Sequence, residues 1–190
     1  MSDVLLFHHA LGLTDGVVAF ADELRSAGHT VTTPDLFDGT TFDDVNDGVA
    51  HAGELGFGTI AESGAAHADG LGDRLVVAGF SLGVMPAQLL AQTRPGVVGA
   101  IFYHGAAPLE AFGDGTWPTG VALQYHFCED DPWAEEDLPA AREIAGAVGG
   151  DLFVYPGSGH LVADPGSPDH DPLIAARILE RTLTFLDARR

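Results

Sequence analysis

Short apolar runs alternate with longer stretches of helical periodicity along this 190-residue chain. The runs that have the length and content of buried strands are 4–7, 30–33, 75–78, 99–103, 121–127 and 152–155. Strands that alternate with helices pair in parallel and are covered by those helices on both faces of the sheet. The sequence therefore predicts an α/β fold with a mostly parallel sheet, and no insertion is long enough to form a lid domain.

Glycine and proline mark where the helices end. The helical stretches are 14–27 before Gly28, 82–94 before Pro95, 135–148 before Gly149, and 172–188. The segment 42–71 has helical spacing but is interrupted by several glycines, so we expect a broken helix there. Since no linker or repeat divides the chain, we expect one domain over residues 1–190.

Charge and cysteine content exclude several classes of partner. Eight basic residues stand against 28 acidic ones, which gives a formal net charge of −20. A chain this acidic is repelled by nucleic acid and by anionic membrane surfaces. The single cysteine, Cys128, excludes an internal disulfide and any CxxC motif. Without a signal sequence or a membrane-length apolar run, we expect a cytoplasmic monomer or small homo-oligomer.

One serine lies at the turn that follows the third strand. Gly79-Phe80-Ser81-Leu82-Gly83 fits the G-x-S-x-G pattern, in which a strained strand-to-helix turn exposes a nucleophilic hydroxyl. The backbone N–H of Leu82, at the start of the next helix, can stabilise negative charge on an attacked carbonyl. The alternative is an ordinary turn in which serine caps a helix.

A serine nucleophile needs a base and an acid that orients the base, and both follow later strands in the order Ser, Asp, His. The loop after residue 155 carries His160 between glycines and the last helix. After residue 127 comes Cys128-Glu129-Asp130-Asp131-Pro132, and we choose Asp131 because the proline tends to end the strand beside it. Asp130 and Glu129 remain alternatives.

Other histidines raise the question of a metal site. His8 and His9 are adjacent, so their side chains point to opposite faces of a strand and are poorly placed to chelate one ion. His104 and His126 also lie near strand ends, but no HxH or HExxH spacing accompanies them. We therefore expect neither a metal nor a cofactor.

Taken together, these segments resemble the dienelactone hydrolase family of α/β-hydrolases. The segments that carry the resemblance span nearly the whole chain: LFHHALGLTDGV, VVAGFSLGV, IFYHG, HFCEDDPWAE and YPGSGHLVAD. The resemblance implies an α/β-hydrolase fold, Ser81 as nucleophile, His160 as base and Asp131 as its partner. It also implies that Ala10, after the first strand, supplies the second oxyanion N–H beside that of Leu82.

The chain differs from the type enzyme of that family at three positions. That enzyme has cysteine where this chain has Ser81, and a glutamate in the place of His9. Its arginine for the substrate carboxylate would fall near Asp164, so an anionic substrate is not expected here. A shallow pocket around Leu11, Phe57, Trp117 and Trp133 fits a small neutral ester or lactone, and His9 is a further residue that could face the substrate. The aromatic residues could equally belong to the core, which is the commoner place for aromatic side chains.

The leading functional prediction is a serine hydrolase that forms an acyl-enzyme on Ser81. A fold of this kind can also bind a ligand without turnover, since fold alone does not guarantee activity. An acyltransferase or lyase that uses the same triad is a third reading. Dinucleotide binding is disfavoured because HHALGL after the first strand lacks the GxGxxG spacing.

Overall fold

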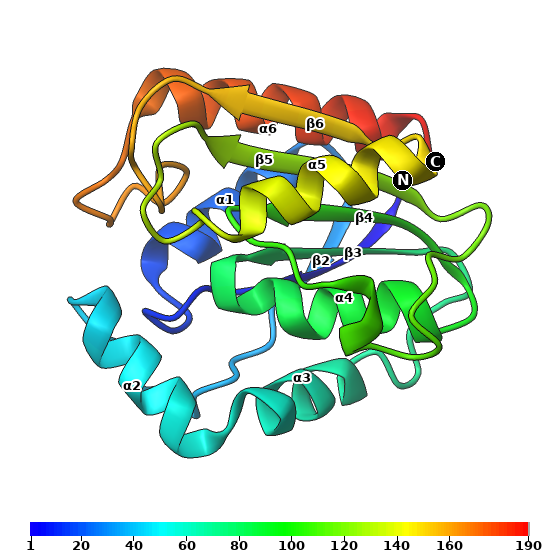
Figure 1. Ribbon diagram of the computed structural model, residues 1–190, viewed down its shortest axis with the longest axis horizontal. Helices are drawn as coiled ribbons and strands as arrows, with labels where there is room; N and C mark the ends of the chain where they lie inside the picture. Colours follow the sequence, from blue (N-terminus) through cyan, green and yellow to red (C-terminus); the bar gives the residue numbers. More distant parts are fainter. Residues whose placement is uncertain (190) are drawn as a thin grey trace.

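The computed structural model describes residues 1–189, which form a parallel six-stranded sheet with helices on both faces (Figure 1). The strand order across the sheet is β2-β1-β3-β4-β5-β6, and each neighbouring pair is parallel. The strands are β1 (Asp3–Phe7), β2 (Thr30–Thr32), β3 (Leu75–Phe80), β4 (Val97–Tyr103), β5 (Ala122–Cys128) and β6 (Asp151–Tyr155). The predicted α/β class is confirmed, and each predicted strand lies within a few residues of its observed position.

The helices also follow the sequence closely. They are α1 (Asp15–Ser26), α2 (Val45–Leu55), α3 (Phe57–Ala66), α4 (Val84–Thr93), α5 (Asp137–Val148) and α6 (Pro172–Asp187), with short 3-10 turns at Ser81–Gly83 and Leu109–Ala111. The expected break within 42–71 occurs at Gly56, whose φ of 89° is accessible to glycine and costly for other residues. This glycine ends α2 and starts α3.

Side-chain burial divides the helices between two faces of the sheet. On one face, α1 and α6 pack against β1, β3 and β4 around Phe20, Leu24 and Phe185. On the other face, α4 and α5 cover a second cluster that includes Phe102, Tyr125 and Phe127. Strands covered on both faces carry apolar residues at successive positions, and β3 is buried along its full length. Within the described residues no helix is long and apolar enough to cross a membrane.

The strand order places a crevice at one edge of the sheet. From β1 the chain moves first to β2 on one side and then to β3 on the other, so the loops after β1 and β3 diverge at their carboxyl ends. Open parallel sheets bind ligands in such a crevice. The segment after β1 holds Ala10 and the turn after β3 holds Ser81, which puts both beside the crevice.

Candidate active site

Ser81 sits in a strained turn between β3 and α4. Its φ is 48°, a left-handed value that non-glycine residues seldom adopt. A Cβ at Gly83 would lie 2.6 Å from the carbonyl oxygens of Phe7 and His8, and a Cβ at Gly79 would overlap the carbonyl of Gly83. The two glycines therefore allow the turn to pass close to β1, and the side chain of Ser81 remains partly exposed.

A continuous hydrogen-bond chain connects Ser81 to two other loops. The Oγ atom of Ser81 lies 2.8 Å from Nε2 of His160, and Nδ1 of the same ring lies 2.7 Å from Oδ2 of Asp131. His160 comes from the loop after β6 and Asp131 from the loop after β5. Three residues separated widely in sequence thus meet at the carboxyl edge of the sheet.

Burial separates Asp131 from the two alternative acids. Asp131 is 4% exposed, whereas Glu129 and Asp130 are exposed and use only their backbone N–H groups, which donate to Tyr155 and Gly157. Oδ1 of Asp131 accepts a 3.0 Å hydrogen bond from the N–H of Trp133. Burial raises the pKa of Asp131, but hydrogen bonds from two histidines outweigh that effect and hold the pKa at about 2. The carboxylate is therefore ionised at neutral pH.

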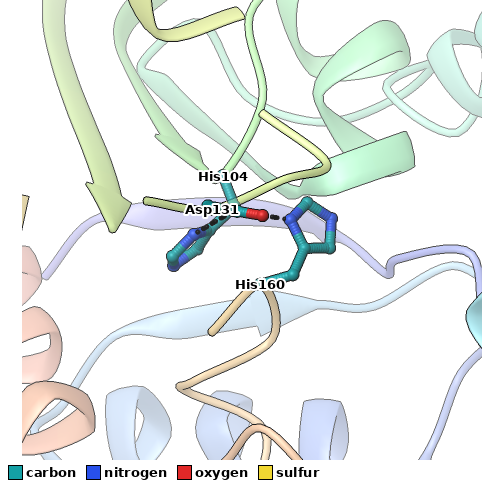
Figure 2. Close-up of side chains that lie close together, drawn as sticks. All are labelled: His104, Asp131 and His160. Carbon is teal, nitrogen blue, oxygen red and sulfur yellow. Dashed lines mark hydrogen bonds and ion pairs between the residues drawn. The ribbon is translucent and has the colours of Figure 1, made fainter. Parts of the chain in front are cut away.

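The second histidine on this carboxylate is His104, which follows β4. Its Nδ1 lies 3.2 Å from Oδ2 of Asp131, the same oxygen that bonds His160 (Figure 2). The sequence placed His104 near a strand end but gave no sign that its ring turns toward Asp131. The backbone of His104 has a φ of 54°, and no local sequence pattern predicts that conformation.

His104, Asp131 and His160 are also the group of described residues whose ligand atoms lie close enough together to hold a metal ion, within 4.8 Å of one another. Their two Nδ1 atoms already bond the carboxylate oxygen, and a bound cation would have to replace both bonds. We therefore interpret the cluster as a hydrogen-bond network. His8 does not contribute to a metal site either, because its ring bonds the carbonyl of His9 and the N–H of Leu36.

The side chain of His9 is buried and hydrogen-bonded within the protein. Its Nε2 lies 2.8 Å from Oδ2 of Asp164, and its Nδ1 accepts a 3.3 Å hydrogen bond from the N–H of Leu11. Asp164 also accepts from the hydroxyl of Thr14 at 2.7 Å. Both ring nitrogens of His9 form hydrogen bonds, so His9 stabilises the loop after β1. We did not predict this role.

The two backbone groups proposed for an oxyanion hole lie on neighbouring segments. Ala10 and Leu82 belong to the same small apolar cluster, together with residues of α2 and α3. Within residues 1–189 the N–H of Ala10 donates no hydrogen bond to another backbone group. Helix α2 supports this loop from outside, since a Cβ at Gly48 would overlap the carbonyl of Ala10.

The aromatic residues expected around the pocket separate into different environments. Trp133 is 44% exposed, and its ring centroid lies 6.1 Å from that of His160. Phe57 is exposed at the start of α3, and Leu11 is buried beside Ala10. Trp117 was expected in the pocket, but it packs against the core at Phe102 and donates to the carbonyl of Val121. Trp117 is therefore partly buried against the core, the alternative that the sequence left open.

The fold and this arrangement define the class of the protein, an α/β-hydrolase without a lid domain. The chain belongs to the dienelactone hydrolase family, whose family model matches residues 2–189, and it is a carboxylic ester hydrolase. No curated protein matches the chain.

Solved structures share the fold at low sequence identity. A dienelactone hydrolase-like promiscuous phosphotriesterase from metagenomic libraries is 18% identical, with 100% of this chain and 87% of that one covered and a TM-score of 0.75. A cold-adapted esterase from an Arctic intertidal metagenomic library is 19% identical, with 99% and 82% covered and a TM-score of 0.62. A thermophilic esterase from Thermogutta terrifontis, bound to butyrate, is 17% identical, with 98% and 83% covered and a TM-score of 0.60.

Proposed function

We propose that this protein hydrolyses a small, neutral carboxylic ester or lactone through an acyl-enzyme on Ser81. The observation that carries the proposal is the hydrogen-bond chain from Ser81 Oγ through His160 to Asp131, with distances of 2.8 and 2.7 Å. A serine hydroxyl becomes an effective nucleophile when a histidine removes its proton as the new bond forms. The ionised Asp131 supports this role because it holds the His160 ring with the proton on Nδ1 and leaves Nε2 free to accept.

The reaction would proceed in two half-reactions. Ser81 Oγ attacks the ester carbonyl while its proton passes to Nε2 of His160, and the N–H groups of Leu82 and Ala10 stabilise the oxyanion. The tetrahedral intermediate collapses, and the alcohol leaves with the proton from His160. A water molecule, activated by the same ring, then releases the carboxylic acid and restores Ser81. In a lactone, the leaving alcohol remains attached to the acyl group.

Charge around the loop after β1 supports a neutral substrate. A cavity of about 400 Å³ borders Leu11, and the acids Asp15, Asp43 and Asp164 contribute to its wall. No lysine or arginine lines this cavity in the part of the chain that the structure describes. Ser81 and His160 do not line this cavity, but Leu11 follows Ala10 in the same loop. A substrate carboxylate that reached the cavity would lie beside like charges, which favours neutral esters over anionic ones. Exposed Trp133 offers an apolar surface beside His160.

Covalent labelling tests this proposal directly. A fluorophosphonate probe should form one adduct, located by peptide mapping on Ser81, and the adduct should be absent in Ser81→Ala and His160→Ala. Ser158→Ala is a matched control, because Ser158 is an exposed serine in the same loop as His160. Its labelling should equal that of the wild type.

Turnover then separates hydrolysis from simple binding. The wild type should release p-nitrophenol from p-nitrophenyl acetate and should act less on an ester with a free carboxylate. If Ser81 stays unlabelled under conditions that label a control hydrolase, the acyl-enzyme mechanism is wrong. Labelling with acyl transfer to an added alcohol, and none to water, would identify a transferase.

A further inference from the structure

The ring of His104 directs its one hydrogen bond to the carboxylate of Asp131. The Nδ1–Oδ2 distance is 3.2 Å, and His104 is 2% exposed. Its Nε2 has no hydrogen-bond partner within residues 1–189. A buried nitrogen without a partner carries a cost in stability, so the single bond to Asp131 is the polar interaction for which this side chain is placed.

The protonation states of the two rings follow from the ionised carboxylate between them. A carboxylate can only accept hydrogen bonds, so both His104 and His160 must carry a proton on Nδ1. Burial lowers the pKa of His104 and so favours the neutral ring. This fits an Nε2 atom that has no hydrogen-bond partner among residues 1–189. Figure 2 shows the carboxylate oxygen facing both Nδ1 atoms.

We propose that His104 is a positioning residue that acts on His160 through Asp131. Its Nδ1–H fixes the rotation of the Asp131 carboxylate and takes part of the negative charge on Oδ2. Less of that charge then faces the His160 ring. This inference rests on the proposed function, since it concerns the base of the proposed triad.

Other charged or titratable groups face this cluster and must stay constant in a test. Asp169, in the segment before α6, accepts the backbone N–H of His160 at 3.0 Å and acts on His104 through its charge. Asp137, at the start of α5, interacts through its charge with Asp131 and His160, and His126 of β5 interacts electrostatically with His104. The variants below leave all of these groups in place.

Two substitutions at His104, one that keeps a side-chain donor and one that removes it, test the hydrogen bond, and the pH profile distinguishes its loss from a change in the turn. His104→Asn keeps a side-chain N–H close to the position of Nδ1, and asparagine tolerates the positive φ at this residue. His104→Leu has a side chain of comparable size and no donor, and the positive φ also strains leucine. The measured quantity is the rate of Ser81 labelling by the fluorophosphonate across pH, together with kcat and KM for p-nitrophenyl acetate.

We expect His104→Leu to move the midpoint of the acidic limb upward by about half a pH unit or more, because Asp131 then acts more strongly on protonated His160. His104→Asn should restore the wild-type midpoint. The expected loss in His104→Leu is in kcat, with KM nearly unchanged. A merely structural role would lower the rate by the same factor at every pH. Unchanged midpoints in both variants, or equal shifts in both, would overturn the proposal.

A measurement on the wild type keeps the proposal testable if His104→Leu does not fold. Nitrogen-15 NMR of the histidine rings at neutral pH should show His104 as the neutral tautomer protonated on Nδ1. A proton on Nε2 of His104 would contradict the inference even where Ser81 is labelled normally. Failure of the proposed function is distinct, because it would appear as an unlabelled Ser81 in the wild type.

Discussion

The side chain of Asp131 accepts more hydrogen bonds than those of the other two acids that we considered for the triad. Its Oδ1 accepts from the N–H of Trp133, and its Oδ2 accepts from His160 and His104. Burial alone would favour the protonated acid, and these donors reverse that preference. Its neighbours thus keep the carboxylate ionised and fix its orientation, and an acid that orients a histidine needs both.

Asp131→Asn should reduce kcat for an ester substrate by about 10³- to 10⁴-fold, as loss of the orienting carboxylate does in other serine hydrolases. The amide keeps the shape of the carboxylate but removes the charge and presents an N–H group to one of the rings. Asp130→Asn is the matched control, because its exposed side chain lies one residue away and should leave kcat unchanged. Equal losses in the two variants would mean that Asp131 has no special role.

At the scale of elements, the turn from β3 into α4 is held by backbone contacts rather than by side chains. Gly83 approaches the carbonyl oxygens of Phe7 and His8 at the end of β1, and Gly79 approaches Gly83 itself. The positive φ of Ser81 persists because the strand before it and the helix after it are both buried. The position of the nucleophile therefore depends on two neighbouring strands.

Gly83→Ala should lower the free energy of unfolding by about 2 kcal/mol or more, since a Cβ would lie 2.6 Å from two β1 carbonyl oxygens. Urea denaturation monitored by circular dichroism would measure it. Gly53→Ala in α2 is the control: a Cβ there meets nothing within 4 Å, and alanine favours helix by about 1 kcal/mol. Destabilisation of the same size in both variants would contradict the packing argument.

At the scale of the whole molecule, buried neutral histidines link stability to pH. Burial lowers the pKa of His8 to about 4, and it also lowers the pKa values of His104 and His126. These rings gain a proton on unfolding at a pH where the folded protein leaves them neutral. Because the unfolded state then binds more protons, stability rises with pH across this range.

The free energy of unfolding should therefore fall as pH decreases from 6.5, the ordinary pKa of histidine, to about 4. His8 alone accounts for about 3 kcal/mol of that loss, from a shift of 6.5 to about 4. Urea denaturation at several pH values would measure the slope, and His8→Gln should reduce it. A stability that is flat from pH 4 to 6.5 would contradict the assignment. Carboxylates with lowered pKa values, such as Asp131, add to the loss below pH 3.8.

Much of this architecture was accessible from the sequence because it depends on local patterns. The α/β class follows from strand spacing and turn residues, and the family follows from the resemblance of several motif segments to it. The order Ser81, Asp131, His160 could be predicted because parallel strands bring their carboxyl ends to one edge, and its catalytic role stays a prediction. The ring directions of His104 and His9 were not accessible, because they depend on a left-handed backbone and on a partner about 155 residues away. The sequence left Trp117 open between pocket and core because an aromatic residue suits either place, and the structure packs it against the core.

The contact between Gly48 and the loop after β1 limits which substitutions the sequence of α2 can accept. Helix α2 touches the carbonyl of Ala10 backbone to backbone, so one methyl group added at Gly48 would push against the residue whose N–H we propose to stabilise the oxyanion. The outward face of the same helix carries exposed residues such as Asp47 and Glu54 and is free of that constraint. Substitutions along α2 should thus be tolerated on one side and harmful on the other, although neither side holds a reacting group.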